Sequence, residues 1–268
     1  MKKHSFAIWS IIFFLPTFIF IICPAIYIFL VDPLRQWDHP WHLTRWHRPF
    51  NERIQKTNYL ASHKVNIDTL IVGSSRSSYI NPKWLGTENG FNYAVSSGKP
   101  SEFATHIRYV KKRSRIPLKL VVIESSFGHA LAVDTTFEEP QKYIKDAENW
   151  TRKCKNLFSR DTYKLAKSSR CSPQYNYYLY EGGTLHSYRY PYIEYPDSAA
   201  KEKVVSSQIE SYRENAYNKD YDESFAEHLS DIHNAFGDTD FIVYTTPVSM
   251  PMIQLIYEMG RIDAYERW

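Results

Sequence analysis

Two adjacent serines that follow a short apolar run are the residues of this chain best suited to nucleophilic chemistry. Residues 69–72 form the run, and the turn Gly73-Ser74-Ser75-Arg76 follows it directly. A serine at a tight strand-to-helix turn is exposed, and backbone N–H groups of the turn can point at one spot. This geometry suits an attacking hydroxyl with an oxyanion hole, and it suits a phosphate cradle equally well. An ordinary serine-rich turn is the remaining interpretation.

Four short apolar runs supply the elements that would position this turn. They are residues 69–72, 91–95, 118–123 and 241–244, and each is followed by turn-forming residues. Short continuous apolar runs of this kind indicate buried strands of a parallel sheet. Because ligands bind beyond the carboxyl ends of such strands, we expect the turns after the runs to meet at one site.

Helical patterns lie between the apolar runs. Phe103, Ile107 and Val110 repeat at helical spacing, with Pro100 at a favourable first-turn position. Similar patterns occupy residues 204–216 and 225–236. The alternation of strand and helix predicts an α/β domain with a parallel sheet, which extends over residues 61–268.

The turn Gly73-Ser74-Ser75-Arg76 resembles the first sequence block of the SGNH (GDSL-type) hydrolases, in a variant with serine in place of aspartate. Residues 92–98, Asn-Tyr-Ala-Val-Ser-Ser-Gly, resemble the second block. The variant is similar to membrane-anchored, exported members of the family, the alginate O-acetyltransferase-like and teichoic-acid D-alanyl transfer proteins. The resemblance implies an SGNH/flavodoxin-like domain, in which three layers are built around a parallel sheet.

The same resemblance implies a set of catalytic roles. Ser75 would be the nucleophile, and its N–H together with that of Gly98 would hold the oxyanion. The family has an asparagine after the third strand, where this chain has Glu124-Ser125-Ser126, so Ser125 is the candidate replacement donor. The loss of one such donor costs about 2.7–4 kcal/mol in the transition state.

No motif in this sequence matches the block that supplies the general base in the family. Its Asp-x-x-His block follows a fifth strand, and neither is found in this sequence. We therefore expect the α/β domain to be incomplete, without its last strand and helix. A serine hydroxyl without a base is a poor nucleophile, so the chain would be inactive unless another base serves. His129, just beyond the third apolar run, is the candidate substitute.

An uncharged apolar stretch precedes the α/β domain. Residues 6–31 are long enough to cross a bilayer, and Lys2 and Lys3 stand before them in a short cytoplasmic tail, residues 1–5. A cleaved signal peptide is the alternative, but the stretch is too long and no small-x-small cleavage site follows it. The sequence predicts a single-pass protein of the cytoplasmic (inner) membrane, with its C-terminal domain outside the cytoplasm.

Two further segments accompany the α/β domain. Residues 32–60 form a juxtamembrane connector with interspersed Trp and His, typical of a membrane–water interface, and no metal site is expected there. Residues 135–197 form a tyrosine-rich insertion whose rings either stack on sugars or pack the loop. Cys154 and Cys171 would form a disulfide worth about 3 kcal/mol in an exported domain, or remain two reduced thiols.

Composition excludes several classes of protein. The hydrophobic fraction of 43% excludes a disordered chain. The net charge is only +4, and no basic stripe extends beyond Lys111-Lys112-Arg113, so nucleic-acid binding is not expected. No cofactor is expected either.

Three functions compete on this reading. The first is an anchored, exported esterase or acyltransferase that acts through Ser75 on cell-envelope polysaccharide, beside membrane proteins of polysaccharide biosynthesis. The second is a non-catalytic envelope protein that binds a glycan or a partner protein. The third is a sulfotransferase, because residues 73–78 faintly resemble the phosphate loop of those enzymes. Two points oppose it. Pro82 would end the helix that such a loop requires, and an exported domain would have no access to the cytosolic sulfate donor.

Overall fold

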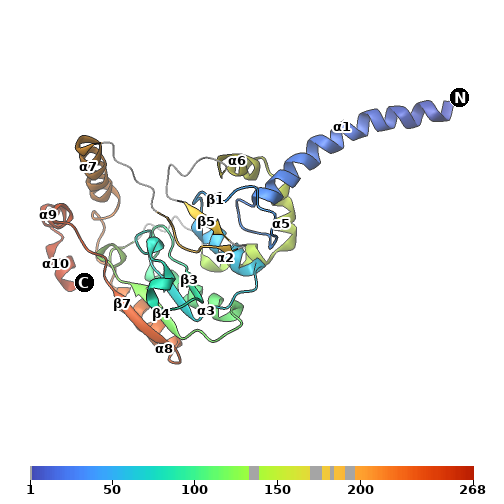
Figure 1. The fold of residues 1–268 in the computed structure, drawn as a ribbon. Coiled ribbons are helices and arrows are strands. Elements are labelled where there is room, and N and C mark those ends of the chain that lie inside the picture. Colours follow the sequence, from blue (N-terminus) through green and yellow to red (C-terminus); the bar gives the residue numbers. More distant parts are fainter. Residues whose placement is uncertain (1, 133–138, 170–176, 182–183, 191–196) are drawn as a thin grey trace. The chain divides into compact units, whose positions relative to one another are not determined.

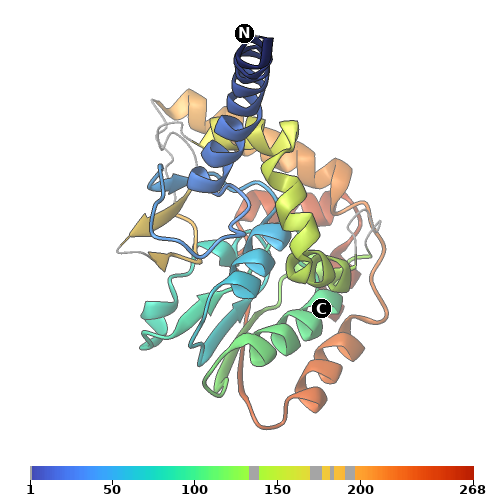
Figure 2. The ribbon, with the colours of Figure 1, turned by 90° about the vertical axis from the view of Figure 1, so that its right-hand side faces the viewer.

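The fold is taken from a computed structural model, which describes residues 2–132, 139–169, 177–181, 184–190 and 197–268 (Figures 1 and 2). The chain divides into two compact units. Unit 1 comprises Met1–His63 and Tyr143–His186, and unit 2 comprises Lys64–Lys142 and Ser187–Trp268. Residues 135–197 were predicted to be an insertion in a single domain. The structure instead groups most of that stretch with the N-terminal segment.

A parallel sheet forms the centre of unit 2. Its strands are β2 (Thr69–Val72), β3 (Gly90–Asn92), β4 (Leu120–Glu124) and β7 (Asp240–Tyr244), and their order across the sheet is β3-β2-β4-β7 (Figure 1). Each neighbouring pair is parallel. The expected mixed α/β architecture with a parallel four-stranded sheet is therefore confirmed.

The burial of each strand follows from its place in the sheet. All of β2 is buried, and so are the last residues of β4, because these two strands lie in the middle with neighbours on both sides. Continuous runs of β-branched residues suit such positions. β7 lies at an edge of the described sheet, and its Ile242 and Val243 are 47% and 56% exposed.

Helix α3 (Pro100–Arg113) connects the second and third strands of the sheet in chain order. Pro100 is its first residue. Proline lacks a backbone N–H, but an N–H in the first turn of a helix has no intrahelical partner, so nothing is lost there. Phe103, Ile107 and Val110 are fully buried, and the basic residues of the last turn, Lys111–Arg113, suit the negative end of the helix dipole. The predicted helix is thus confirmed. α3 contacts β2 and packs beside α8 (Figure 2).

The remaining elements of unit 2 lie after the strands. They are the 3-10 turns η1 (Ser77–Tyr79), η2 (Pro82–Leu85) and η3 (Phe127–His129), and the helices α7 (Ser198–Asn215), α8 (Phe225–Ala235), α9 (Met250–Glu258) and α10 (Ile262–Arg267). An apolar cluster of Phe127, Leu131, Tyr217, Leu255 and Ile256 buries one side of η3. Tyr265 and Trp268 from the last helical turn also pack on Phe127. Trp268 therefore belongs to the core that holds η3 in place.

Unit 1 begins with the long helix α1 (Lys2–Val31). Its portion Ile12–Val31 is long and apolar enough to cross a membrane, by length and composition. The last turns of α1 pack on α5 (Trp150–Leu157) and α6 (Arg160–Ser169), where Ile28 and Val31 meet Ala166. α4 (Pro140–Glu148) precedes these helices and begins before the division at Tyr143.

The segment of unit 1 that was predicted to be a connector is folded and is not a free linker. It contains β1 (Trp46–His47) and α2 (Glu52–Ser62), and β1 joins β5 (Tyr178–Glu181) and β6 (Thr184–Leu185) in a three-stranded sheet. Both strand pairings are antiparallel. Tyr178 donates its hydroxyl to Glu52 on α2, and the guanidinium of Arg35 lies 4.2 Å from the centre of the Tyr178 ring. These long-range contacts explain why two segments distant in sequence form one unit.

Candidate functional site

A cleft of about 390 Å³ lies in unit 2 at the carboxyl ends of the parallel strands, and we call it the strand-end cleft. Its lining comes from the turn after β2, the loop before α3, the η3 region and the end of α7. The lining residues are Ser74, Ser75, Arg76, Ser97, Gly98, Lys99, Ser126, Gly128, His129, Leu131, Ala132, Tyr212, Asn215, Ala216 and Lys219. The expected convergence of the strand-end turns is therefore realised for the first three strands, a common ligand site in parallel sheets.

The two serines after β2 have different surroundings. Ser74 donates its backbone N–H to the Glu124 carboxylate at 2.7 Å, and its hydroxyl lies 2.8 and 2.9 Å from the two oxygens of the same group. Ser75 is half-buried, lines the strand-end cleft, and its hydroxyl forms no hydrogen bond to another described residue. Ser74 therefore anchors the turn, and Ser75 is the serine whose hydroxyl remains available for a ligand.

Glu124 is the residue that fixes this turn, and the sequence analysis gave it no role of its own. It is fully buried at the end of β4 and also accepts a hydrogen bond from Ser77, whose hydroxyl in turn accepts one from Tyr244 at 2.6 Å. Burial alone would raise the pKa of Glu124, but His129 and the serine hydrogen bonds hold that pKa below its usual value. The sequence contains a signal for this anchoring role: a single acidic residue directly after an apolar run.

A second side chain holds the turn from the other neighbouring strand. Asn92, at the end of β3, donates its side-chain amide to the backbone oxygens of Ser77 and Ile80 at 2.8 and 2.9 Å. The polypeptide after β2 is therefore fixed from both sides, by Glu124 of β4 and by Asn92. This arrangement preorganises the position of Ser75.

Gly98 serves close backbone packing in the strand-end cleft. Its N–H donates to the Val95 carbonyl at 2.9 Å, so that donor is already engaged. A Cβ atom on Gly98 would lie 2.4 Å from the backbone oxygen of Gly73. The structure thus gives a steric reason for glycine here, and it does not leave the Gly98 N–H open to an oxyanion.

Ser125 lies outside the lining of the strand-end cleft. Its N–H donates to the Tyr244 carbonyl at 2.8 Å, and its hydroxyl accepts a bond of 3.4 Å from the Trp268 indole. Ser126, the next residue, does line the cleft. Of the expected oxyanion donors, only the Ser75 N–H has no hydrogen-bond partner among the described residues.

His129 is the titratable side chain that best fits the chemistry of a base. Its ring is 4% exposed, and its Nδ1 atom lies 3.0 Å from the Glu124 carbonyl oxygen. If Nδ1 carried no proton, its lone pair would face the lone pairs of the carbonyl oxygen, which is unfavourable. We therefore assign the proton to Nδ1. The Ser126 N–H, at 3.4 Å from the same atom, makes the weaker contact. Nε2 then carries a lone pair and has no partner among the described residues.

The charge state of His129 follows from its surroundings. Burial lowers the pKa of the imidazole to about 4; the charges of Lys99 and Arg76 act in the same direction, and Glu124 opposes them. The ring is therefore neutral at pH 7 and able to accept a proton. Ser75 and His129 line the same cleft, which is what the sequence-based assignment of the two roles requires.

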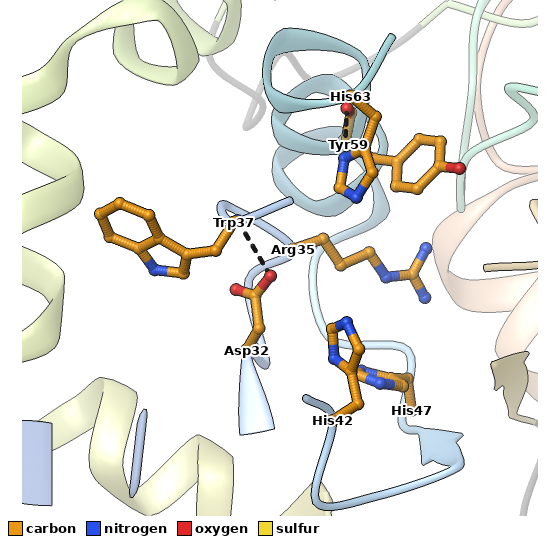
Figure 3. A pocket seen from close by; sticks show the side chains of 7 residues that line it. All are labelled: Asp32, Arg35, Trp37, His42, His47, Tyr59 and His63. Atoms are coloured by element: carbon orange, nitrogen blue, oxygen red, sulfur yellow. Dashed lines mark hydrogen bonds between the residues drawn. The ribbon is translucent and has the colours of Figure 1, made fainter. Parts of the chain in front are cut away.

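A smaller pocket lies within unit 1 (Figure 3). Its volume is about 10 Å³, room for about one water molecule. It is lined by Asp32, Arg35, Trp37, His42, His47, Tyr59 and His63. Among the described residues there is no group of three or more His, Cys, Asp or Glu arranged to hold a metal ion.

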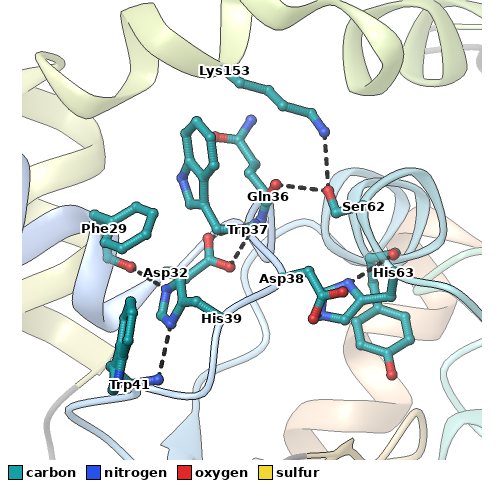
Figure 4. Close-up of polar contacts among 11 residues, drawn as sticks. Phe29, Asp32, Gln36, Trp37, Asp38, His39, Trp41, Ser62, His63 and Lys153 are labelled. Atoms are coloured by element: carbon teal, nitrogen blue, oxygen red, sulfur yellow. Dashed lines mark hydrogen bonds and ion pairs between the residues drawn. The ribbon is translucent and has the colours of Figure 1, made fainter.

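The polar groups around that pocket form hydrogen bonds that hold its walls together (Figure 4). Asp32, just after α1, accepts hydrogen bonds from the Gln36 and Trp37 N–H groups at 2.8 and 3.0 Å. Lys153 of α5 donates to the Ser62 hydroxyl at 3.0 Å, and that hydroxyl donates to the Gln36 carbonyl at 2.7 Å. These bonds hold the segment that follows α1 against α2 and α5.

Two further expectations concern the tyrosine-rich stretch and the cysteines. Cys154 is a half-buried free thiol on α5, and Cys171 lies outside the described residues. Tyr178 is buried in unit 1, and the hydroxyls of Tyr188 and Tyr190 lie 2.6 Å apart. These contacts are packing contacts within the described part of the stretch.

Comparison of the chain with protein-family models, curated proteins and solved structures found no match.

Proposed function

We propose that the strand-end cleft is an acyl-transfer site in which Ser75 is the nucleophile and His129 is the general base. The observation that carries this proposal is that two residues line the same cleft: Ser75, whose hydroxyl is unengaged, and His129, whose buried Nε2 has no described partner. A nucleophile, a neutral base and a group that orients the base are the parts that such chemistry needs. Here the orienting group is the Glu124 carbonyl.

The proposed reaction begins with attack of the Ser75 hydroxyl on the carbonyl carbon of an ester. The hydroxyl proton passes to Nε2 of His129, and the oxyanion of the tetrahedral intermediate faces the Ser75 N–H. When the intermediate collapses, the ester C–O bond breaks and the leaving alcohol takes the proton from His129. Water or a sugar hydroxyl then attacks acyl-Ser75, gives its proton to His129, and releases the serine, which recovers that proton.

The architecture supports an SGNH-like, membrane-anchored setting for this site. The order β3-β2-β4-β7 corresponds to the first four strands of the flavodoxin-like order, in which the second strand in sequence lies at one edge. The apolar span Ile12–Val31 would anchor the protein in the cytoplasmic membrane, with the C-terminal domain outside the cytoplasm. Cell-envelope polysaccharide is the proposed acceptor, and membrane proteins of its biosynthesis are the proposed partners.

A serine-directed fluorophosphonate tests the proposal on the full-length protein in detergent micelles. We expect the wild type to be labelled, Ser75→Ala to lose labelling, and His129→Asn to slow it about a hundredfold or more. Ser101→Ala, on an exposed position of α3, is the matched control and should label normally. Labelling that persists in Ser75→Ala would refute Ser75 as the nucleophile.

A non-catalytic binding protein of the envelope is the second candidate. The occupied N–H of Gly98 and the position of Ser125 outside the cleft lining favour it, because they leave the oxyanion hole with few donors. If the wild type is folded but unreactive towards the fluorophosphonate, this candidate replaces the acyltransferase.

A further inference from the structure

We infer that the strand-end cleft binds an anionic group, so that the molecule it recognises carries a carboxylate, sulfate or phosphate. Arg76, Lys99 and Lys219 line the cleft, and its described lining contains no Asp or Glu. As a statement about the substrate this deepens the proposed acyl transfer and rests on it. The binding itself depends only on the charges and their surroundings.

Arg76 is held in the wall of the cleft by neutral oxygen atoms. Its guanidinium donates to the Thr246 hydroxyl at 3.0 Å and to the Tyr212 hydroxyl at 2.7 Å, and it lies 5.5 Å from the centre of the Tyr212 ring. No described carboxylate forms an ion pair with it. The charge is therefore oriented without being neutralised, which suits recognition of an anion.

Lys99, a second cation in the lining of the cleft, has the same kind of support. Its ammonium group donates to the backbone oxygens of Gly128 and Leu131 at 2.6 and 3.2 Å. Burial lowers the pKa of Lys99 to about 8 against the raising effect of Asp222 and Glu102, so the group is mostly charged at neutral pH. Neither carboxylate forms an ion pair with it in the structure.

Two further features favour an anion between these cations. Lys99 directly precedes α3, so the positive end of that helix dipole lies at the cleft. The buried carboxylate of Glu124 is engaged by the hydroxyls of Ser74 and Ser77, and Glu124 does not line the cleft.

Isothermal titration of the full-length protein in micelles tests the inference with glucuronate, methyl phosphate and glucose as probes. We expect saturable binding of a charged probe, weakened by added salt, and none of glucose. Binding of glucuronate alone indicates a carboxylate ligand, binding of methyl phosphate alone a phosphate ligand, and binding of both a general anion site. Each of these results supports the inference, and binding of neither charged probe overturns it.

Variants locate the binding and separate it from catalysis. Lys99→Met keeps the length of the side chain and should weaken binding about tenfold or more. Lys219→Gln, a half-exposed position, should weaken it less and serves if Lys99→Met does not fold. Arg115→Gln, exposed before the amino end of β4, removes the same charge elsewhere and should have no effect. Equal binding by Lys99→Met, Lys219→Gln and Arg115→Gln would overturn the inference.

Ser75→Ala distinguishes failure of the inference from failure of the proposed function. It removes the nucleophile but no charge, so it should lose labelling and still bind the charged probe. If fluorophosphonate labelling fails while the charged probe still binds, the acyl-transfer proposal falls and the anion site stands. If labelling succeeds and no charged probe binds, only the anion site falls.

Discussion

Acidification should destabilise unit 2 through His129, and the size of the effect can be worked from the structure. Burial lowers the folded-state pKa of this imidazole from 6.5 to about 4. Between these values the unfolded chain binds a proton that the folded one does not. The contribution of His129 to stability is therefore complete above the unfolded pKa and is lost as the pH falls towards 4. Between pH 7 and pH 5, linkage gives a loss of about 2 kcal/mol.

Native-state hydrogen exchange in full-length protein in micelles measures this effect within unit 2. The amide of Val122 in buried β4 reports the opening free energy at pH 7, 6 and 5. His129→Asn keeps a donor near the Glu124 carbonyl but removes the titrating ring. We expect its opening free energy to fall with pH by about 2 kcal/mol less than that of the wild type.

The comparison isolates His129 because the other histidines remain in both proteins. His42 and His47 of unit 1 also have pKa values lowered by burial, to about 4 and about 3, and their effects cancel in the difference. His233→Asn, at an exposed position of α8, is the matched control and should keep the wild-type pH dependence. If His129→Asn follows the wild-type pH dependence, or is more sensitive to acid, the argued burial of a neutral imidazole is wrong.

Two substitutions around the strand-end cleft should also change stability. Gly98→Ala places a Cβ atom 2.4 Å from the Gly73 backbone oxygen. It should lower the free energy of unfolding, measured by urea denaturation, by about 1–3 kcal/mol. Gly237→Ala is the control, because its Cβ atom would have no neighbour within 4 Å, and it should leave that free energy unchanged. Glu124→Gln removes an acceptor for two serine hydroxyls and should lower the same free energy by about 1–3 kcal/mol. Asp238→Asn, at an exposed ion pair with Lys111, should lower it much less than Glu124→Gln does, and equal losses in the two acidic variants would contradict the role given to Glu124.

The strands of unit 2 were predictable because their signal is local. A run such as residues 69–72 is β-branched or aliphatic at every position, which favours a strand buried on both faces, and the turn residues that follow mark its end. The helix at Pro100–Arg113 was predictable for the same reason, since its buried face repeats with the helical period. The bounds shifted at β3, which ends at Asn92 and not at residue 95. The predicted burial of the fourth run was wrong, because β7 has a neighbour on one side only in the described sheet and is largely exposed.

The organisation of unit 1 was not predictable in the same way. The pairing of β1 with β5 and the contacts of Tyr178 with α2 join residues far apart in sequence, and neither strand carries a strong pattern of its own. The connector therefore looked like a linker. Its buried polar contacts become visible only when the partners are brought together.

The sequence by itself determined the parallel-sheet architecture of unit 2 and pointed to Ser75 and His129 as residues to examine. Local periodicity and turn chemistry carry that information. Only the tertiary structure decided the rest: that Ser74 is bound to Glu124 while Ser75 is not, and that the Gly98 N–H is already engaged. The physical reason is that a hydrogen bond or a buried charge depends on partners from other elements, which no local pattern specifies.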